Sequence, residues 1–225
     1  LYGDRFLPRL PAASADTPTL RVMTFNAPFP AYGSDDAQLT GNILAQQADI
    51  VLLQELTTQG MQMLQRRMPE HYPYILAETS GLPHEGKLIL SKFPLRAEWV
   101  IDGVTPRRTT QVAVVTVDGH EIVLANMHPT ATAGVARLED LPAYVAETFS
   151  RREREIVEDR DVLLDEQRPI IIAGDLNAND QTMGYRLLAD QYVDAWREAG
   201  WGFGHTFPAP VLRLELPPDF LHRER

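Results

Sequence analysis

The segment IIIAGDLNAND at residues 170–180 passes directly from a branched aliphatic run into a cluster of aspartates and asparagines. A short, continuous apolar run of this kind is typical of a buried strand. Strand interiors are packed, whereas the loops that follow them are free to carry functional groups. The segment therefore predicts a rigid strand that presents Asp175 and Asn177 at its end.

Three other aliphatic runs also end in a side chain that can do chemistry. LRVMTFN ends in Asn26, IVLLQE ends in Glu55, and IVLANMH ends in His128. Each residue alone has a simpler interpretation, as a turn asparagine, a helix-capping acid or a hydrogen-bonded surface histidine. Their recurrence favours a common site, because ligands of α/β proteins gather at the ends of strands.

The order of the predicted elements favours two stacked sheets with helices outside them. Strands and helices alternate over residues 19–68, whereas β-type runs fill residues 73–127, with a hairpin signal at Asp118-Gly119. A charged helical region is predicted from residue 135 to about 166, interrupted by Pro142, and a strand, a short helix and a glycine-rich loop follow it. The expected fold class is α/β, as a sandwich whose middle strands are antiparallel.

Length and composition limit the possible classes of protein. The 225 residues, 44% of them hydrophobic, suit one domain over residues 20–225, preceded by a linker rich in proline and alanine over residues 1–19. With 31 acidic and 21 basic side chains, the net charge of −10 opposes nonspecific coating of nucleic acids. The absence of cysteine excludes disulfides, thiolate metal sites and a cysteine nucleophile. No run is apolar for long enough to span a membrane.

The side chains at the strand ends suit a site that hydrolyses a phosphate ester. Carboxylate and amide oxygens are ligands that Mg²⁺, Mn²⁺ and Ca²⁺ prefer, and a histidine can bind or protonate a phosphate oxygen. A zinc site is a weaker interpretation, because the six histidines are scattered and lack the spacing of zinc-binding motifs.

These segments resemble a known family. VMTFN, ADIVLLQE, LILSKFPL, IVLANMH, IIIAGDLNAND and HTFP are similar, in order and spacing, to the endonuclease/exonuclease/phosphatase superfamily of deoxyribonuclease I-like enzymes. The resemblance covers roughly residues 20–221, and GDLNAND is its most specific part. It implies a four-layer α/β/β/α sandwich of two mainly antiparallel sheets, and a phosphoesterase that uses Mg²⁺ or Mn²⁺.

The resemblance also implies a role for each residue of the site. Glu55 matches the metal-binding glutamate of the family, and Asn26 matches the asparagine that arranges the metal and the phosphate. His128 matches the histidine that contacts the scissile phosphate. Asp175 matches the aspartate that positions or activates the attacking water, and Asn177 matches the asparagine that holds a phosphate oxygen.

The carboxyl-terminal part departs from the family pattern. Asp219 in DFLH is the best match to an aspartate that orients the family's last histidine, and Glu215 is a poorer match. The Ser-Asp-His motif that ends the family pattern is absent. Truncation of a longer protein is the expectation, and loss of catalysis is the alternative, because that histidine is the usual general base.

Further residues could contact the substrate. Lys87, Arg107 and Arg108 are candidates for phosphate binding, with a solvated strand edge as the alternative for Lys87. Trp201 or Phe203, in the glycine-rich loop, could touch the substrate, although such aromatic residues more often belong to the core.

The expected reaction is hydrolysis of a phosphodiester by in-line attack of an activated water. The substrate could carry a lipid headgroup, be a small molecule or be a nucleic acid, and no protein partner or oligomeric state is indicated. A metal-dependent endonuclease and a noncatalytic phosphate-binding domain are the alternatives. The start, LYGDRFLPRLP, resembles a segment that links membrane helices to an extracytoplasmic domain in some bacterial members, so a membrane-associated, extracytoplasmic protein is an expectation.

Overall fold

The structure is a computed structural model of the chain. It describes residues 19–28, 36–79, 84–102, 109–132, 135–137, 139–202, 204, 206 and 213–215, with only the backbone described at 135–137 and 213–215. Five helices are present in this part of the chain: α1 (Asp36–Ala45), α2 (Thr58–Arg67), α3 (Leu141–Leu163), α4 (Met183–Ala189) and α5 (Ala195–Ala199). The strands are β1 (Val22–Asn26), β2 (Ile50–Leu56), β3 (Tyr74–Glu78), β4 (Gly86–Ser91), β5 (Leu95–Ile101), β6 (Thr110–Val117), β7 (His120–Met127), β8 (Val135–Arg137), β9 (Ile170–Gly174) and β10 (Arg213–Glu215).

The described chain forms two compact units. The larger one, here called the sandwich unit, contains residues 19–129 and 154–178. The second unit contains the described residues of 130–153 and those from 179 onward. The single domain predicted for residues 20–225 stays a prediction, and residues 1–18 of the predicted linker lie outside the described residues.

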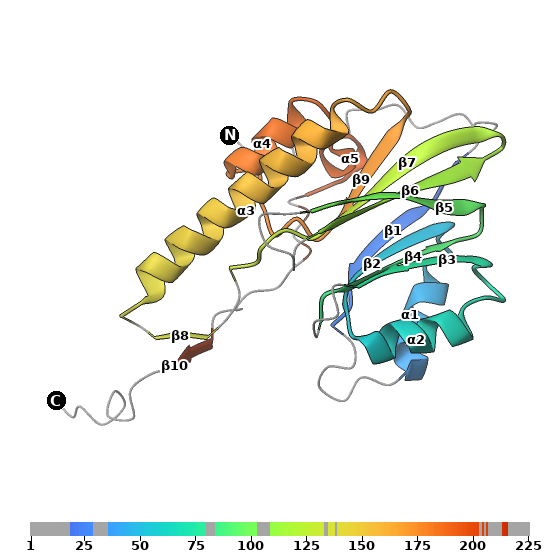
Figure 1. Cartoon of the computed structure of the whole chain (residues 1–225), viewed down its shortest axis with the longest axis horizontal. Coiled ribbons are helices and arrows are strands. Elements are labelled where there is room, and N and C mark those ends of the chain that lie inside the picture. Colours follow the sequence, from blue (N-terminus) through green and yellow to red (C-terminus); the bar gives the residue numbers. More distant parts are fainter. Residues whose placement is uncertain are drawn as a thin grey trace. The chain divides into compact units, whose positions relative to one another are not determined.

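Two four-stranded sheets make up the centre of the sandwich unit (Figure 1). The first has the order β1-β2-β4-β3 and the second has the order β5-β6-β7-β9. β1 pairs with β2 in parallel and β7 pairs with β9 in parallel, whereas the other pairs are antiparallel. The prediction of a sandwich of two mainly antiparallel sheets is confirmed.

Three apolar layers hold the sandwich unit together. On one face of the first sheet, residues such as Val51 and Leu53 pack with Ile43 of α1 and Leu64 of α2. Between the sheets lies a second cluster, and on the other face of the second sheet Leu163 of α3 packs against strand residues. The alternation of each strand therefore divides its apolar residues between two layers, which gives the order helix, sheet, sheet, helix.

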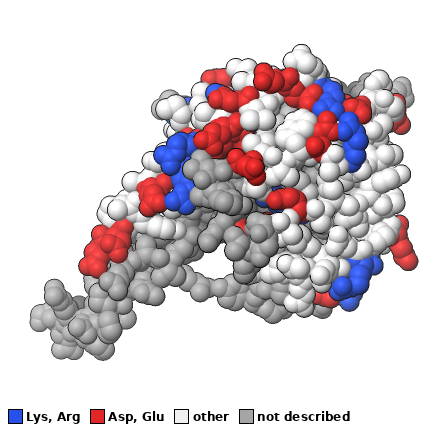
Figure 2. Space-filling model, in the orientation of Figure 1, with Lys and Arg blue, Asp and Glu red and all other residues white. Residues whose placement is uncertain are grey.

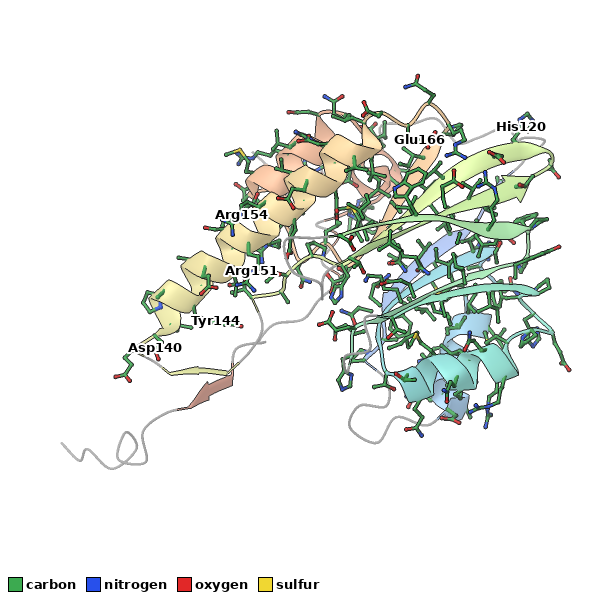
Figure 3. All side chains as sticks on the ribbon, viewed as in Figure 1. His120, Asp140, Tyr144, Arg151, Arg154 and Glu166 are labelled. Carbon is green, nitrogen blue, oxygen red and sulfur yellow. The ribbon has the colours of Figure 1, made fainter. Side chains whose placement is uncertain are left out.

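Ion pairs tie the start of β9 to β5 and β7. The guanidinium of Arg168 lies 2.7 Å from Glu166, 2.9 Å from Glu98 and 3.1 Å from Glu121. Hydrogen bonds from Arg168 lower the pKa of Glu166 to about 2. Figure 3 labels Glu166, which precedes β9, and His120, the first residue of β7. This network lies at the opposite end of β9 from Asp175.

The second unit is built from short elements held by side chains. β8 and β10 pair in parallel, Thr182 caps α4, and Asp194 caps α5. The hydroxyl of Tyr185 donates to the capping Asp194 at 2.5 Å, which ties α4 to α5. These contacts are polar because the short helices of this unit bury few apolar residues.

The helix predicted from residue 135 begins later than expected. Residues 135–137 form strand β8, and α3 begins at Leu141, so that part of the prediction is wrong. Pro142 does not interrupt the helix, because it lies in the first turn, where its missing N–H has no intrahelical acceptor to lose.

In the described chain, no helix combines the length and apolar character needed to cross a membrane.

A buried carboxyl group joins α3 to the second sheet. The side chain of Asp159 is 3% exposed, and its Oδ2 accepts a hydrogen bond from the hydroxyl of Thr110 at 2.6 Å. Burial, with repulsion from Glu155 and Glu158, raises the pKa of Asp159 to about 7. Since the folded state keeps this proton up to a higher pH than the unfolded state does, this group makes stability fall as pH rises from about 4 to about 7.

We expect Asp159→Asn to remove this pH dependence. The variant should exceed the wild-type protein in free energy of unfolding at pH 8 by on the order of 4 kcal/mol, and the two should converge near pH 4. Urea denaturation at a series of pH values measures this difference. Asp161→Asn, on the exposed side of the same helix, is the matched control and should follow the wild type. Parallel wild-type and Asp159→Asn curves would contradict the expectation.

Candidate active site

Four strands of the sandwich unit bring the predicted residues to one edge. Asn26 is the last residue of β1, Glu55 lies near the end of β2, and His128 directly follows β7. Asp175 directly follows β9, with Asn177 two residues later. The parallel pairs β1–β2 and β7–β9 explain the convergence, since parallel strands place their carboxyl ends at the same edge of a sheet.

One amide group connects two carboxylates at this edge. Nδ2 of Asn26 donates to Oε1 of Glu55 at 3.0 Å and to Oδ2 of Asp175 at 2.9 Å. Nε2 of His128 lies 3.2 Å from the same oxygen of Glu55, and the imidazole is 2% exposed. Four of the predicted side chains therefore form one connected group, drawn from both sheets.

Asn177 holds Asp175 through its backbone. Its N–H donates to Oδ1 of Asp175 at 3.0 Å, and its side-chain Nδ2 donates to the carbonyl of Pro129 at 3.1 Å. Each carboxylate oxygen of Asp175 thus accepts a hydrogen bond, Oδ2 from the side chain of Asn26 and Oδ1 from the backbone of Asn177. The φ of Asn177 is 50°, a left-handed conformation that asparagine adopts more readily than most residues.

Gly174, the last residue of β9, lies too close to the backbone of β7 to carry a side chain. Its φ is 139°, and a Cβ atom at this position would lie 1.9 Å from the carbonyl oxygen of Met127, its partner in β7. Any side chain here would push β9 away from β7. Gly174 therefore sets the direction in which the chain leaves the strand and presents Asp175.

The donor set fits a hard divalent cation. Within the described ranges, no group of three or more histidine, aspartate and glutamate side chains is placed to hold a metal ion. However, Oδ1 of Asn26 is buried without a hydrogen-bond partner, while its Nδ2 is bonded to two carboxylates. An amide oxygen beside carboxylates suits Mg²⁺ or Mn²⁺, and Mg²⁺ usually keeps several waters when few protein ligands are available.

Lys87 lies in a different polar cluster. It is buried at the start of β4, and its Nζ contacts Oε2 of Glu78 at 3.2 Å and the hydroxyl of Thr109 at 3.1 Å. Its predicted contact with phosphate stays a prediction, and in this structure its ammonium group is paired with Glu78. Glu78 was not predicted as this partner, although YPYILAE ends in an acid and forms the strand beside β4.

Arg107, Arg108, Phe203 and Asp219 lie outside the described residues. Glu215 ends strand β10, of which only the backbone is described. Trp201 is 69% exposed in the second unit. Substrate contacts by Arg107, Arg108, Trp201 and Phe203 stay predictions. The match of Asp219 or Glu215 to the aspartate that orients the family's last histidine also stays a prediction.

The sequence also matches a family model. The model of the Endonuclease/Exonuclease/phosphatase family matches residues 23–216, which include every residue of the connected group. The chain belongs to this family. This confirms the resemblance seen in the strand-end motifs. A search of curated proteins found no significant match.

Solved structures show the same fold at low sequence identity. Sphingomyelinase C from Streptomyces griseocarneus has a TM-score of 0.60 and 23% identity, with 77% of this chain and 70% of that chain covered. A beta toxin structure from Staphylococcus aureus has a TM-score of 0.59 and 17% identity, covering 76% and 71%. TDP2 from C. elegans has a TM-score of 0.53 and 20% identity, covering 72% and 49%. This chain therefore spans about half the length of the TDP2 structure.

We expect Gly174→Ala to destabilise the protein far more than Gly119→Ala does. Both glycines have positive φ, but only at Gly174 would the added Cβ meet backbone atoms. Gly174→Ala should therefore cost about 3 kcal/mol or more, and Gly119→Ala about 1 kcal/mol. Urea denaturation at pH 7 measures both, and equal losses would show that the β7–β9 contact relaxes around the methyl group.

Proposed function

We propose that this protein is a divalent-metal-dependent phosphoesterase that hydrolyses phosphodiesters by in-line attack of water. The observation that carries this proposal is the meeting of Glu55 and Asp175 on the amide of Asn26, beside His128. Two carboxylates and an amide oxygen on the rim of a rigid sandwich suit cation binding, and the imidazole suits contact with a phosphoryl oxygen. Membership of a family of nucleases and phosphatases supports the same chemistry.

In this proposal, Glu55 and Asn26 hold Mg²⁺ or Mn²⁺. The buried Oδ1 of Asn26 and the partly exposed carboxylate of Glu55 are the available oxygen donors. A bound cation of this kind neutralises the negative charge that develops on the phosphoryl oxygens in the transition state.

Asp175 orients the attacking water and accepts its proton. Its two oxygens are fixed by Asn26 and by the backbone of Asn177, which limits rotation of the carboxylate. Restricting a reacting group to one orientation removes part of the entropic cost of the reaction. A carboxylate in this position can act as a general base.

His128 and Asn177 donate hydrogen bonds to the phosphate. The imidazole of His128 is held against Glu55 in a nearly fully buried position, so its direction is set by the fold. The amide of Asn177 has two N–H groups, of which one donates to Pro129. The other can donate to a phosphoryl oxygen.

Surface charge favours a small phosphodiester or a lipid headgroup over a long nucleic acid as substrate. The net charge of the chain is −10. On the face shown in Figure 2, acidic side chains lie among the basic ones, and the described residues form no continuous basic surface there. Binding of a polyanion depends on such a surface, because phosphate contacts by lysine and arginine dominate its affinity.

We expect Glu55→Gln and Asp175→Asn to impair hydrolysis of bis(p-nitrophenyl) phosphate in different ways. Glu55→Gln removes a charge from the metal site, so it should raise the Mn²⁺ concentration needed for half-maximal activity. Asp175→Asn removes the proton acceptor, so it should lower kcat by about 100- to 10,000-fold at saturating Mn²⁺. Activity should require Mg²⁺ or Mn²⁺ and be lost with a chelator.

Glu70→Gln is the matched control, since Glu70 is an exposed acid just after α2. It should leave both kcat and the metal requirement unchanged. Full-length protein that binds Mn²⁺ but turns over no phosphodiester or phosphomonoester would rule out the enzyme proposal and favour a noncatalytic phosphate-binding domain.

A further inference from the structure

Glu55 points into the site only because β2 is irregular. Leu53 pairs with Leu88, and Leu56 pairs with Gly86. Two residues of β2, Gln54 and Glu55, therefore lie opposite a single residue of β4, Lys87. This is a β-bulge, and Glu55 has a φ of 61° within it.

The bulge reverses the direction that alternation predicts for Glu55. Val51 and Leu53 pack on the helix-covered face of the first sheet, and a regular strand would place Glu55 on that face too. In the structure its carboxylate instead contacts Asn26 and His128. β-Bulges beside active sites often redirect a side chain in this way.

Two fully buried amides, Gln54 within the bulge and Asn126 on the other sheet, connect the bulge to the second sheet. Nε2 of Gln54 donates to Oδ1 of Asn126 at 2.7 Å, and Nδ2 of Asn126 donates to the carbonyl of Leu53 at 3.2 Å. Both amide side chains are 0% exposed. Asn126 therefore contacts the two residues that directly precede Glu55.

Asn126 belongs to the strand that carries the histidine of the site. It lies on β7 two residues before His128, and its Nδ2 also donates to Gln111 of β6 at 3.2 Å. One buried side chain thus links the backbone that aims Glu55 to the backbone that carries His128. A shift of one sheet past the other would break these hydrogen bonds and leave buried amides without partners, which costs about 1–3 kcal/mol for each group.

We propose that Asn126 and Gln54 are positioning residues that fix the carboxylate of Glu55 for binding of the divalent cation. This inference rests on the proposed function of the site. Neither amide is proposed to touch the metal or the substrate, and both act through the conformation of the bulge. Groups that orient a metal ligand typically change metal affinity or activity by about 10- to 100-fold when they are removed.

The test is the affinity of the full-length protein for Mn²⁺, measured by electron paramagnetic resonance of the unbound ion. Asn126→Leu keeps the branching of the side chain and removes its hydrogen bonds, and Gln54→Met removes the same contact from the other side. Each should raise the Kd for Mn²⁺ by about 10- to 100-fold. If one variant fails to fold, the other carries the test.

Thr110→Val is the matched control for loss of a buried hydrogen bond in the same unit. Thr110 is 1% exposed, and its hydroxyl donates to Asp159 of α3 rather than to Gln54 or Asn126. It should leave the Kd for Mn²⁺ within about 2-fold of the wild-type value, since it does not contact a residue that orients Glu55.

A double-mutant cycle separates positioning from a general structural effect. In a Glu55→Gln background, Asn126→Leu should have little further effect on the Kd for Mn²⁺, because the carboxylate it positions is already absent. An equal effect in both backgrounds, or unchanged affinity in Asn126→Leu and Gln54→Met, would overturn the inference alone. Wild-type protein that binds no Mn²⁺ would overturn the proposed function together with it.

Discussion

The candidate site depends on the amide of Asn26, which joins a carboxylate from each sheet. Glu55 belongs to the first sheet and Asp175 follows the second, and both accept from the same nitrogen at about 3 Å. Two anions held this close repel each other unless donors or a cation offset the repulsion. The amide offsets part of it, and its own oxygen remains buried without a partner. The proposed cation would offset the rest of the repulsion and give that oxygen a partner.

The space between the sheets changes from apolar to polar as it approaches this site. Along β2, Ile50 and Leu52 give way to Gln54, and along β7, Leu124 gives way to Asn126. Apolar contacts are non-directional, so they stabilise the sandwich without fixing its register closely. Hydrogen bonds between buried amides are directional and costly to lose. The polar layer thus restricts movement between the sheets where a small offset would separate Glu55 from His128.

Much of this arrangement could be predicted from the sequence, because each functional residue ends an apolar run. That pattern located Asn26, His128 and Asp175 at strand ends, and the structure brings them together. The direction of Glu55 could not be predicted, since neither Gln54 nor Glu55 is a residue that signals a bulge or a left-handed backbone. The short strand at residues 135–137 was also missed, because its partner β10 lies far away in the sequence. Local patterns carry no information about such pairing.

Two residues of the site, Glu55 and Asn177, have left-handed backbone conformations, but their costs differ. Asparagine adopts this conformation readily, whereas for a glutamate it costs about 1–2 kcal/mol. Strain of this kind persists only when the surrounding structure over-determines it. Around Glu55, that surrounding structure includes the hydrogen bonds among Gln54, Asn126 and the carbonyl of Leu53. The N–H groups of these buried amides are hydrogen-bonded in the same conformation that aims Glu55 at His128. Part of the folding free energy of the sandwich therefore holds the strained backbone of Glu55 in place.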